Sequence, residues 1–176
     1  MDTLPYHQIP AYPMTYTAAT VAARMLDGLG YRFYWVSKDL RPEDLAYKPS
    51  EDGRTIEETM QHIYGLSKTT LNAIMTEPNV RSATREELNY EQLREKTLLN
   101  IKAAADHLRN NPEIDLNEAK IIFQRGEKVS EFPFWNLLNG HIADAIYHTG
   151  QVVAFRRASG NPQQSGVSVF SGKTRE

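Results

Sequence analysis

Apolar residues recur at helical spacing in four parts of the chain, and the first part follows a proline-containing lead-in. Thr15 and Thr17 are both suitable N-caps for a helix that begins there. Gly28 and Gly30 weaken this helix locally, so tertiary packing must hold it. Its predicted apolar face contains Val21, Met25, Leu29, Phe33 and Val36.

The second and third helices have clear sequence signals at their N-termini. Thr55 is followed three residues later by Glu58, which is the pattern of a capping box, and the helix is expected to run to about Ile74. Asn89 and Gln92 make the same pattern for the third helix. The apolar face predicted for the third helix contains Leu93, Thr97, Ile101, Ala104 and Leu108.

The last third of the chain contains one ambiguous stretch and one long helix. The stretch "IIFQRGEKVSEF" is typical either of a short hairpin around "RGEK" or of an irregular connection. A fourth helix is expected from Pro133 through Arg157, ending at Gly160. We therefore predict an all-α fold, a four-helix bundle with the short hairpin as an optional addition before the last helix. The chain is expected to be one domain over 1–176, with a helical core over about 15–160 and an irregular tail over 161–176.

Composition narrows the class of protein. The chain has 176 residues, a formal net charge of -2 and no cysteine. This charge gives no electrostatic footprint for nucleic acid, and the absence of cysteine excludes disulfides and thiolate metal sites. The first residues lack the basic and apolar segments of a signal peptide, and no apolar run is long enough to span a membrane. We expect a cytoplasmic protein without membrane or nucleic-acid partners.

Polar side chains with metal-binding chemistry lie along one side of the fourth helix. At 100° per residue, a group of residues falls within about 80° of one another: Leu137, His141, Asp144, His148, Gln151 and Phe155. Asp144 and His148 are four residues apart, so both can reach one point above the helix. Imidazole and carboxylate together suit zinc, nickel, iron or manganese. From the residues alone, an ordinary hydrogen-bonded pair within the core is the favoured interpretation of Asp144 and His148, with a metal site second.

A catalytic site of the zinc type needs three protein ligands and an open position, so a third ligand must come from another helix. His62 is the best candidate by elimination, because His7 lies in the lead-in and His107 lies at the end of the third helix. Periodicity places His62 at the flank of the apolar stripe, where a boundary residue without ligand function is more typical than a ligand.

Three further residues near these positions have simpler interpretations. For His141 three interpretations remain open: a fourth ligand, a hydrogen-bond partner of a ligand, or a partly exposed residue. A role other than that of a ligand is favoured. Gln151 is interpreted as structural or as a partner of a ligand. The capping box accounts for Glu58, although it lies one turn before His62.

Two segments resemble the DinB/YfiT-like superfamily: "TIEETMQHIYGLS" in the second helix and "DAIYHTGQVVAFRRASGNP" in the fourth. The resemblance covers about 15–162. It implies a four-helix bundle, often a homodimer, with a divalent metal held between helices. Carried over, the ligands are His62, Asp144 and His148, with Asp144 at a position where many members have histidine. An aspartate there shifts the metal preference toward harder ions.

The resemblance also implies chemistry on a small-molecule substrate. Similar proteins include S-transferases and isomerases that use low-molecular-weight thiols, and metal-dependent hydrolases. In each case the metal acts as a Lewis acid that activates a thiol or a water. Two other hypotheses remain: a non-enzymatic bundle with a structural metal or a polar cluster, and a metal-free module that binds a small molecule.

Overall fold

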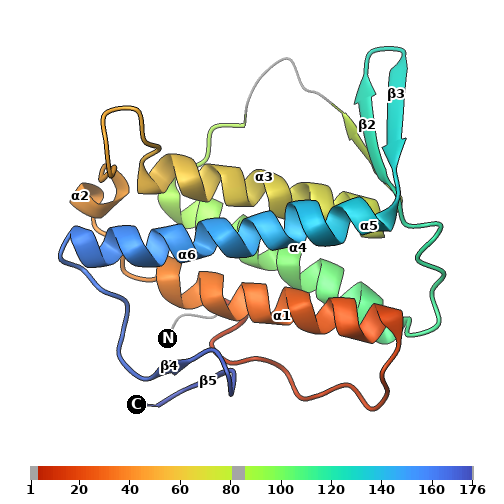
Figure 1. The fold of residues 1–176 in the computed structure, drawn as a ribbon, viewed down its shortest axis with the longest axis horizontal. Coiled ribbons are helices and arrows are strands. Elements are labelled where there is room, and N and C mark those ends of the chain that lie inside the picture. Colours follow the sequence, from red (N-terminus) through yellow and green to blue (C-terminus); the bar gives the residue numbers. More distant parts are fainter. Residues whose placement is uncertain (1–3, 81–85, 176) are drawn as a thin grey trace.

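Four long helices dominate the computed structural model, which describes residues 4–80 and 86–175. They are α1 (Ala18–Ser37), α3 (Ile56–Ile74), α4 (Tyr90–Asn110) and α6 (Ala143–Ala158), and they lie side by side (Figure 1). α1 packs against α4 and α6, and α3 packs against the same two helices. Residues 1–3, 81–85 and 176 of the predicted single domain lie outside this description. Among the described residues, no helix combines the length and apolar character needed to cross a bilayer.

The three helix starts predicted from side-chain caps are confirmed. Thr17, rather than Thr15, caps α1, and its hydroxyl accepts the backbone N–H three residues later at 3.2 Å. Thr55 caps α3 in the same way at 3.0 Å, and Asn89 caps α4 at 2.9 Å. These contacts pair backbone N–H groups that a helix leaves without intrahelical partners, so local sequence is enough to place them.

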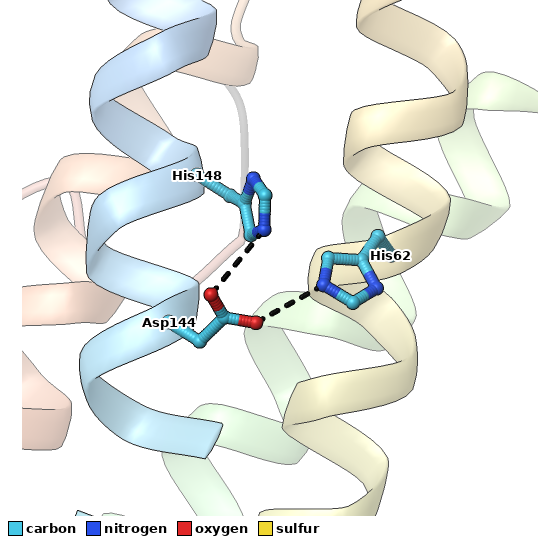
Figure 2. A group of neighbouring side chains, drawn as sticks. All are labelled: His62, Asp144 and His148. Atoms are coloured by element: carbon cyan, nitrogen blue, oxygen red, sulfur yellow. Dashed lines mark hydrogen bonds and ion pairs between the residues drawn. The ribbon is translucent and has the colours of Figure 1, made fainter. Parts of the chain in front are cut away.

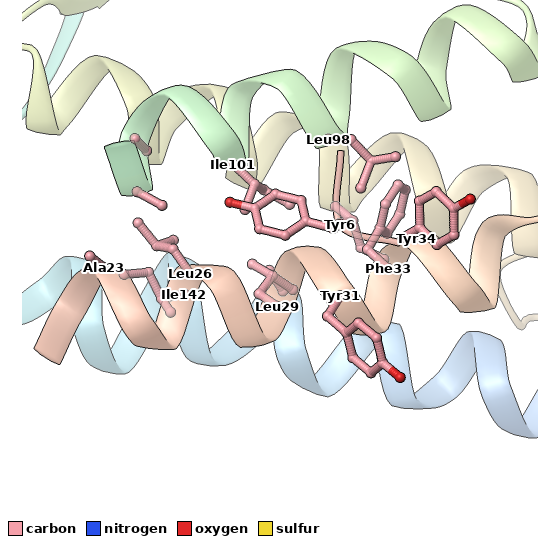
Figure 3. Packing of buried hydrophobic residues seen from close by; sticks show 14 of the residues in the cluster. Tyr6, Ala23, Leu26, Leu29, Tyr31, Phe33, Tyr34, Leu98, Ile101 and Ile142 are labelled. Atoms are coloured by element: carbon pink, nitrogen blue, oxygen red, sulfur yellow. The ribbon is translucent and has the colours of Figure 1, made fainter. Parts of the chain in front are cut away.

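The predicted apolar face of α4 is buried throughout, whereas that of α1 is only partly correct. Val21 is 52% exposed and Met25 is 49% exposed, although Leu29, Phe33 and Val36 are buried as predicted. The buried stripe at the start of α1 instead uses smaller residues and one leucine: Ala22, Ala23 and Leu26. Val21 and Met25, whose size favours burial, each precede a residue of the buried stripe by one position. Figure 3 shows Phe33 and Tyr34 of α1 on the side that faces Leu98 and Ile101 of α4, whereas Tyr31 points away from α4.

The N-terminal segment packs closely onto α1. A Cβ atom at Gly30 would lie 2.4 Å from the ring of Tyr6, so this approach requires glycine. The Tyr6 hydroxyl donates to buried Asp27 at 3.3 Å, and Arg109 of α4 donates to both oxygens of the same carboxylate at 2.6 and 2.7 Å. Tyr6 therefore adds to the packing of α4 and α6 on the glycine-weakened helix.

The ambiguous stretch before the last helix is a hairpin, and the fold is therefore mostly helical but not all-α. β2 (Ile121–Arg125) pairs antiparallel with β3 (Lys128–Phe132), and β1 (Pro78–Val80) pairs parallel with β2. The tail that was expected to be irregular also carries a short antiparallel pair, β4 (Val167–Ser168) with β5 (Lys173–Thr174). These strands have two to five residues, too few for a periodicity of two to stand out in the sequence.

The last helix is interrupted, which the sequence did not indicate. It begins with α5 (Phe134–Asn136), passes through a π-helical stretch η1 (Leu137–Ile142) and continues as α6. The π-helical stretch changes the register that a constant 100° per residue assumes. His141 lies in this stretch, whereas Asp144, His148 and Gln151 share the regular α-helical spacing of α6.

The C-terminal end of α6 is held by a polar cluster that we call the Asp44 clamp: Arg41, Asp44, Arg156, Ser159 and Asn161. Asp44 belongs to the short helix α2 (Pro42–Leu45) and accepts hydrogen bonds from Arg41, Ser159 and Asn161 at 2.6–2.9 Å. Arg156 donates to three carbonyl oxygens at the end of α1, between 2.8 and 3.3 Å. The clamp therefore ties α2, α6 and α1 together at one end of the molecule.

Candidate metal centre

His62 of α3 meets Asp144 and His148 of α6 across the seam between the two helices. Figure 2 shows the three side chains pointing toward one another from these two helices. His62 Nε2 lies 3.1 Å from Asp144 Oδ2, and His148 Nε2 lies 3.4 Å from Asp144 Oδ1. The imidazole rings of His62 and His148 are 4.6 Å apart and nearly perpendicular. The structure thus brings together the three residues that the sequence singled out.

One ligand atom from each residue lies within 4.8 Å of the others, a spacing that could hold a metal ion. Neighbouring ligands of a tetrahedral zinc are about 3.4 Å apart, because each bond is about 2.1 Å long. The His62 and His148 nitrogens lie 3.1 and 3.4 Å from the two different oxygens of Asp144, which is near this separation. In the described part of the chain, no other set of three His, Cys, Asp or Glu side chains converges in this way. The donor set therefore fits a divalent ion in number and chemistry, and its atoms lie close enough together that they could hold one.

The group lies at the edge of the core rather than inside it. The Asp144 side chain is 41% exposed and that of His62 is 33% exposed, whereas His148 is 13% exposed. Asp144 therefore lies beside the buried face of α6 rather than within the core. The case for a metal site rests on the convergence of the ligand atoms, and the exposure leaves room for a further ligand.

His148 has a second polar partner on its own helix. Its Nδ1 lies 2.7 Å from Gln151 Oε1, three residues further along α6. The exposed ring of Tyr147 lies 5.4 Å from the His148 ring at a steep angle. Gln151 is therefore a direct hydrogen-bond partner of a candidate ligand, which is one of the two roles that the sequence left open for it.

His141 stands apart from the three converging residues. Its Nδ1 is buried and has no hydrogen-bond partner among the described residues, and its ring lies 6.3 Å from that of Phe123. Burial lowers the pKa of His141, the Asp144 carboxylate opposes this effect, and His62 adds to it. The His141 imidazole therefore favours its neutral form.

Glu58 has the role that the capping box predicts. One of its carboxylate oxygens accepts the backbone N–H of Thr55 at 2.8 Å, and Glu58 is absent from the converging set. His7 packs instead against the rings of Tyr34 and Trp35. The elimination that selected His62 from the sequence agrees with these positions.

An open groove of about 1310 Å³ runs along α3 beside the centre. His62 and His141 are part of its wall, but Asp144 and His148 are not. The remaining lining comes from α3, from the start of α4 and from residues on either side of 81–85. Sequence analysis missed this groove, because its walls join segments whose packing no local pattern reports.

Comparison with known proteins identifies the family. A family model described as the DinB family matches residues 30–166, a range that includes His62, Asp144 and His148. No match was found among curated proteins or among solved structures. The family match covers most of the chain and confirms the resemblance inferred from the sequence. This chain belongs to the DinB family.

Proposed function

We propose that the chain binds one divalent metal ion through His62 Nε2, Asp144 and His148 Nε2, and that it is a metal-dependent enzyme of the thiol S-transferase type. The observation that carries the proposal is the convergence of these ligand atoms within 4.8 Å at a partly exposed position. Three protein ligands and an open position are the pattern of catalytic rather than structural zinc sites. When bound, the ion would serve as a Lewis acid that makes a thiol or a water nucleophilic at neutral pH.

The side chains of the centre have separate tasks in this proposal. His62 and His148 approach from different helices, so their positions depend on the packing of α3 against α6. Asp144 turns one oxygen toward each imidazole and supplies the negative charge of the ligand set. The groove beside His62, about 1310 Å³, is larger than typical small-molecule sites, which are about 300–1,000 Å³. It provides space for a substrate next to the open position.

The family resemblance supports a thiol as a substrate, and the geometry of the three side chains supports the binding of a metal ion. In the proposed reaction, a thiol loses its proton and its sulfur attacks an electrophilic carbon. A carbon–sulfur bond forms while a leaving group departs with the bonding electrons. A hydrolase would use water in place of the thiol at the same position.

The first experiment is elemental analysis of untagged protein beside His148→Ala and a control, His107→Ala, which removes a histidine outside the converging set. We expect about one equivalent of a transition metal in the wild type and the control, and a loss in His148→Ala. Metal-containing protein is then mixed with low-molecular-weight thiols and an aryl halide, and the loss of free thiol is followed. Wild type without metal, even after zinc, nickel or manganese is added, would overturn the metal site.

One observation favours a second candidate, a metal-free polar cluster that joins α3 to α6. The 3.1 Å contact between His62 and Asp144 has the length of an ordinary hydrogen bond. This candidate predicts that Asp144→Asn keeps the helices joined and that no metal is taken up. Elemental analysis of the wild type separates the two candidates.

We further propose that the long helices form the four-helix bundle that the resemblance implies. Each of the four packs against two of the others, which supports this arrangement. The homodimer implied by the same resemblance is part of the proposal, and light scattering of the purified protein tests it by its mass in solution.

A further inference from the structure

The contact between His148 and Gln151 determines which nitrogen of the His148 ring carries the proton. A neutral imidazole carries one proton, and the nitrogen that carries it is determined by its partners. His148 Nδ1 lies 2.7 Å from the amide oxygen of Gln151, which accepts hydrogen bonds and cannot donate them. The proton of His148 is therefore placed on Nδ1, and the lone pair is placed on Nε2.

The lone pair on Nε2 points toward the other candidate ligands. Nε2 lies 3.4 Å from Asp144 Oδ1, which is also an acceptor. Two acceptors that face each other repel unless a cation lies between them. In the opposite tautomer, Nε2–H would donate to Asp144 and the cluster would be satisfied without a metal. The orientation of the Gln151 amide thus distinguishes a centre ready for a cation from a closed polar cluster.

We propose that Gln151 is a positioning residue that holds His148 in the tautomer with the proton on Nδ1 and so keeps Nε2 available as a metal ligand. This inference rests on the proposed metal site. Gln151 lies three residues after His148 on the regular part of α6, where side chains at this spacing are neighbours. Because it is neutral, it orients the imidazole without adding a charge to a set that already contains Asp144.

The role of Gln151 depends on the hydrogen-bond acceptor that its side chain offers to His148. Glutamate at this position keeps an acceptor for the Nδ1 proton, so Gln151→Glu retains the positioning. Methionine has a similar length but no strong acceptor, so Gln151→Met removes it. Gln164→Met makes the same change at an exposed position in the tail and serves as the matched control.

The first test is zinc affinity, measured by competition with a chromophoric chelator. Loss of a residue that orients a metal-bound histidine weakens binding by about 10–100-fold, and we expect this for Gln151→Met. Gln164→Met should bind zinc as the wild type does, and Gln151→Glu should bind it at least as tightly, because it keeps the acceptor and adds a negative charge. Binding by Gln151→Met that equals the wild type would overturn the inference, as would a Gln151→Glu affinity as weak as that of Gln151→Met.

The second test is independent of zinc binding. Nitrogen-15 NMR of the His148 ring reports which nitrogen carries the proton in metal-free protein. We expect a proton on Nδ1 in the wild type and a loss of this preference in Gln151→Met. A wild-type ring protonated on Nε2 alone would overturn the positioning role. A wild type that takes up no zinc but keeps the Nδ1 proton would instead overturn the proposed metal site while the role of Gln151 stands.

Discussion

Two aspartates at opposite ends of α6 have contrasting surroundings. The Asp44 side chain is 0% exposed and accepts five hydrogen bonds, three from Arg41 and one each from Ser159 and Asn161. Asp144 is 41% exposed, and its two oxygens face the nitrogens of His62 and His148. Both carboxylates are held between separate elements, yet only Asp144 retains free coordination capacity.

The difference indicates which carboxylate is structural and which is available for a ligand. A carboxylate has about four lone-pair positions, and the donors around Asp44 fill them. The partners of Asp144 are imidazoles, which are themselves metal ligands, and its exposed side remains open. A saturated carboxylate stabilises the fold, whereas an open carboxylate beside two imidazoles attracts a cation. Substitutions at the two positions should therefore affect different properties of the protein.

The largest effect on stability is expected at the clamp. Asp44→Ala leaves the donors of Arg41, Ser159 and Asn161 without their common acceptor. Breaking a buried ion pair costs about 3–5 kcal/mol, and because the Arg41 side chain is 45% exposed we expect a loss of about 3 kcal/mol. Urea denaturation should show this loss in the free energy of unfolding. Asp52→Ala, at an exposed carboxylate in the loop before α3, is the control and should change it by less than about 0.5 kcal/mol. A small effect at Asp44 would mean that the clamp is not a principal contact.

The next effect is the response to acid. Hydrogen bonds from the Arg41 guanidinium hold the pKa of Asp44 well below its ordinary value of 3.8. The unfolded chain therefore takes up this proton first, so the stabilisation by Asp44 is complete above the ordinary pKa and is lost as the pH falls below it. The amide side chain of Asp44→Asn does not take up a proton in either the folded or the unfolded state. Between about pH 4 and pH 2 its stability should fall less steeply than that of the wild type, by up to about 1.4 kcal/mol per pH unit.

Urea denaturation across this pH range measures the difference. Glu86 and Asp106 also have lowered pKa values through nearby lysine side chains, and they contribute equally to both proteins. Equal acid slopes in wild type and Asp44→Asn would show that the Arg41 contact does not persist in solution.

The comparison also shows what the sequence could and could not predict. Caps at Thr17, Thr55 and Asn89 depend on residues three positions apart, so a local pattern is enough to find them. Asp144 and His148 are four positions apart and were found in the same way. The Asp44 clamp joins residues more than a hundred positions apart, and no local pattern reports such contacts.

The candidate site shows the same limit. The exposure of Asp144 is one example, because only tertiary packing determines how far the edge of a helix is covered. The interruption at η1 moves His141 out of the regular register, and no glycine–proline signal marks its start in the sequence. The parallel pairing of β1 with β2 depends on chain segments that meet only in the folded protein.

A smaller effect is expected at the candidate metal centre. Zinc at a hundredfold excess over its dissociation constant should stabilise the wild type by about 2.7 kcal/mol, and a chelator should reverse this. Asp144→Ala should abolish the zinc-dependent gain. Its metal-free stability should stay within about 0.5 kcal/mol of the wild type, because the side chain is partly exposed. Thermal unfolding with and without zinc measures both quantities. A large loss of stability in metal-free Asp144→Ala would instead make Asp144 a structural residue like Asp44.

The smallest effect is expected at Glu58, a third carboxylate that lies one turn from His62 and lines the same groove. Its oxygen accepts the Thr55 backbone N–H, so Glu58→Ala should lose about 0.5 kcal/mol of stability through the weakened cap. Glu58→Gln keeps an acceptor and should match the wild type in urea denaturation. Neither substitution should change zinc affinity, because Glu58 is outside the converging set. If Glu58→Gln bound zinc tenfold more weakly while its stability was unchanged, Glu58 would be a ligand, and the distinction between donor-saturated and open carboxylates would fail at this position.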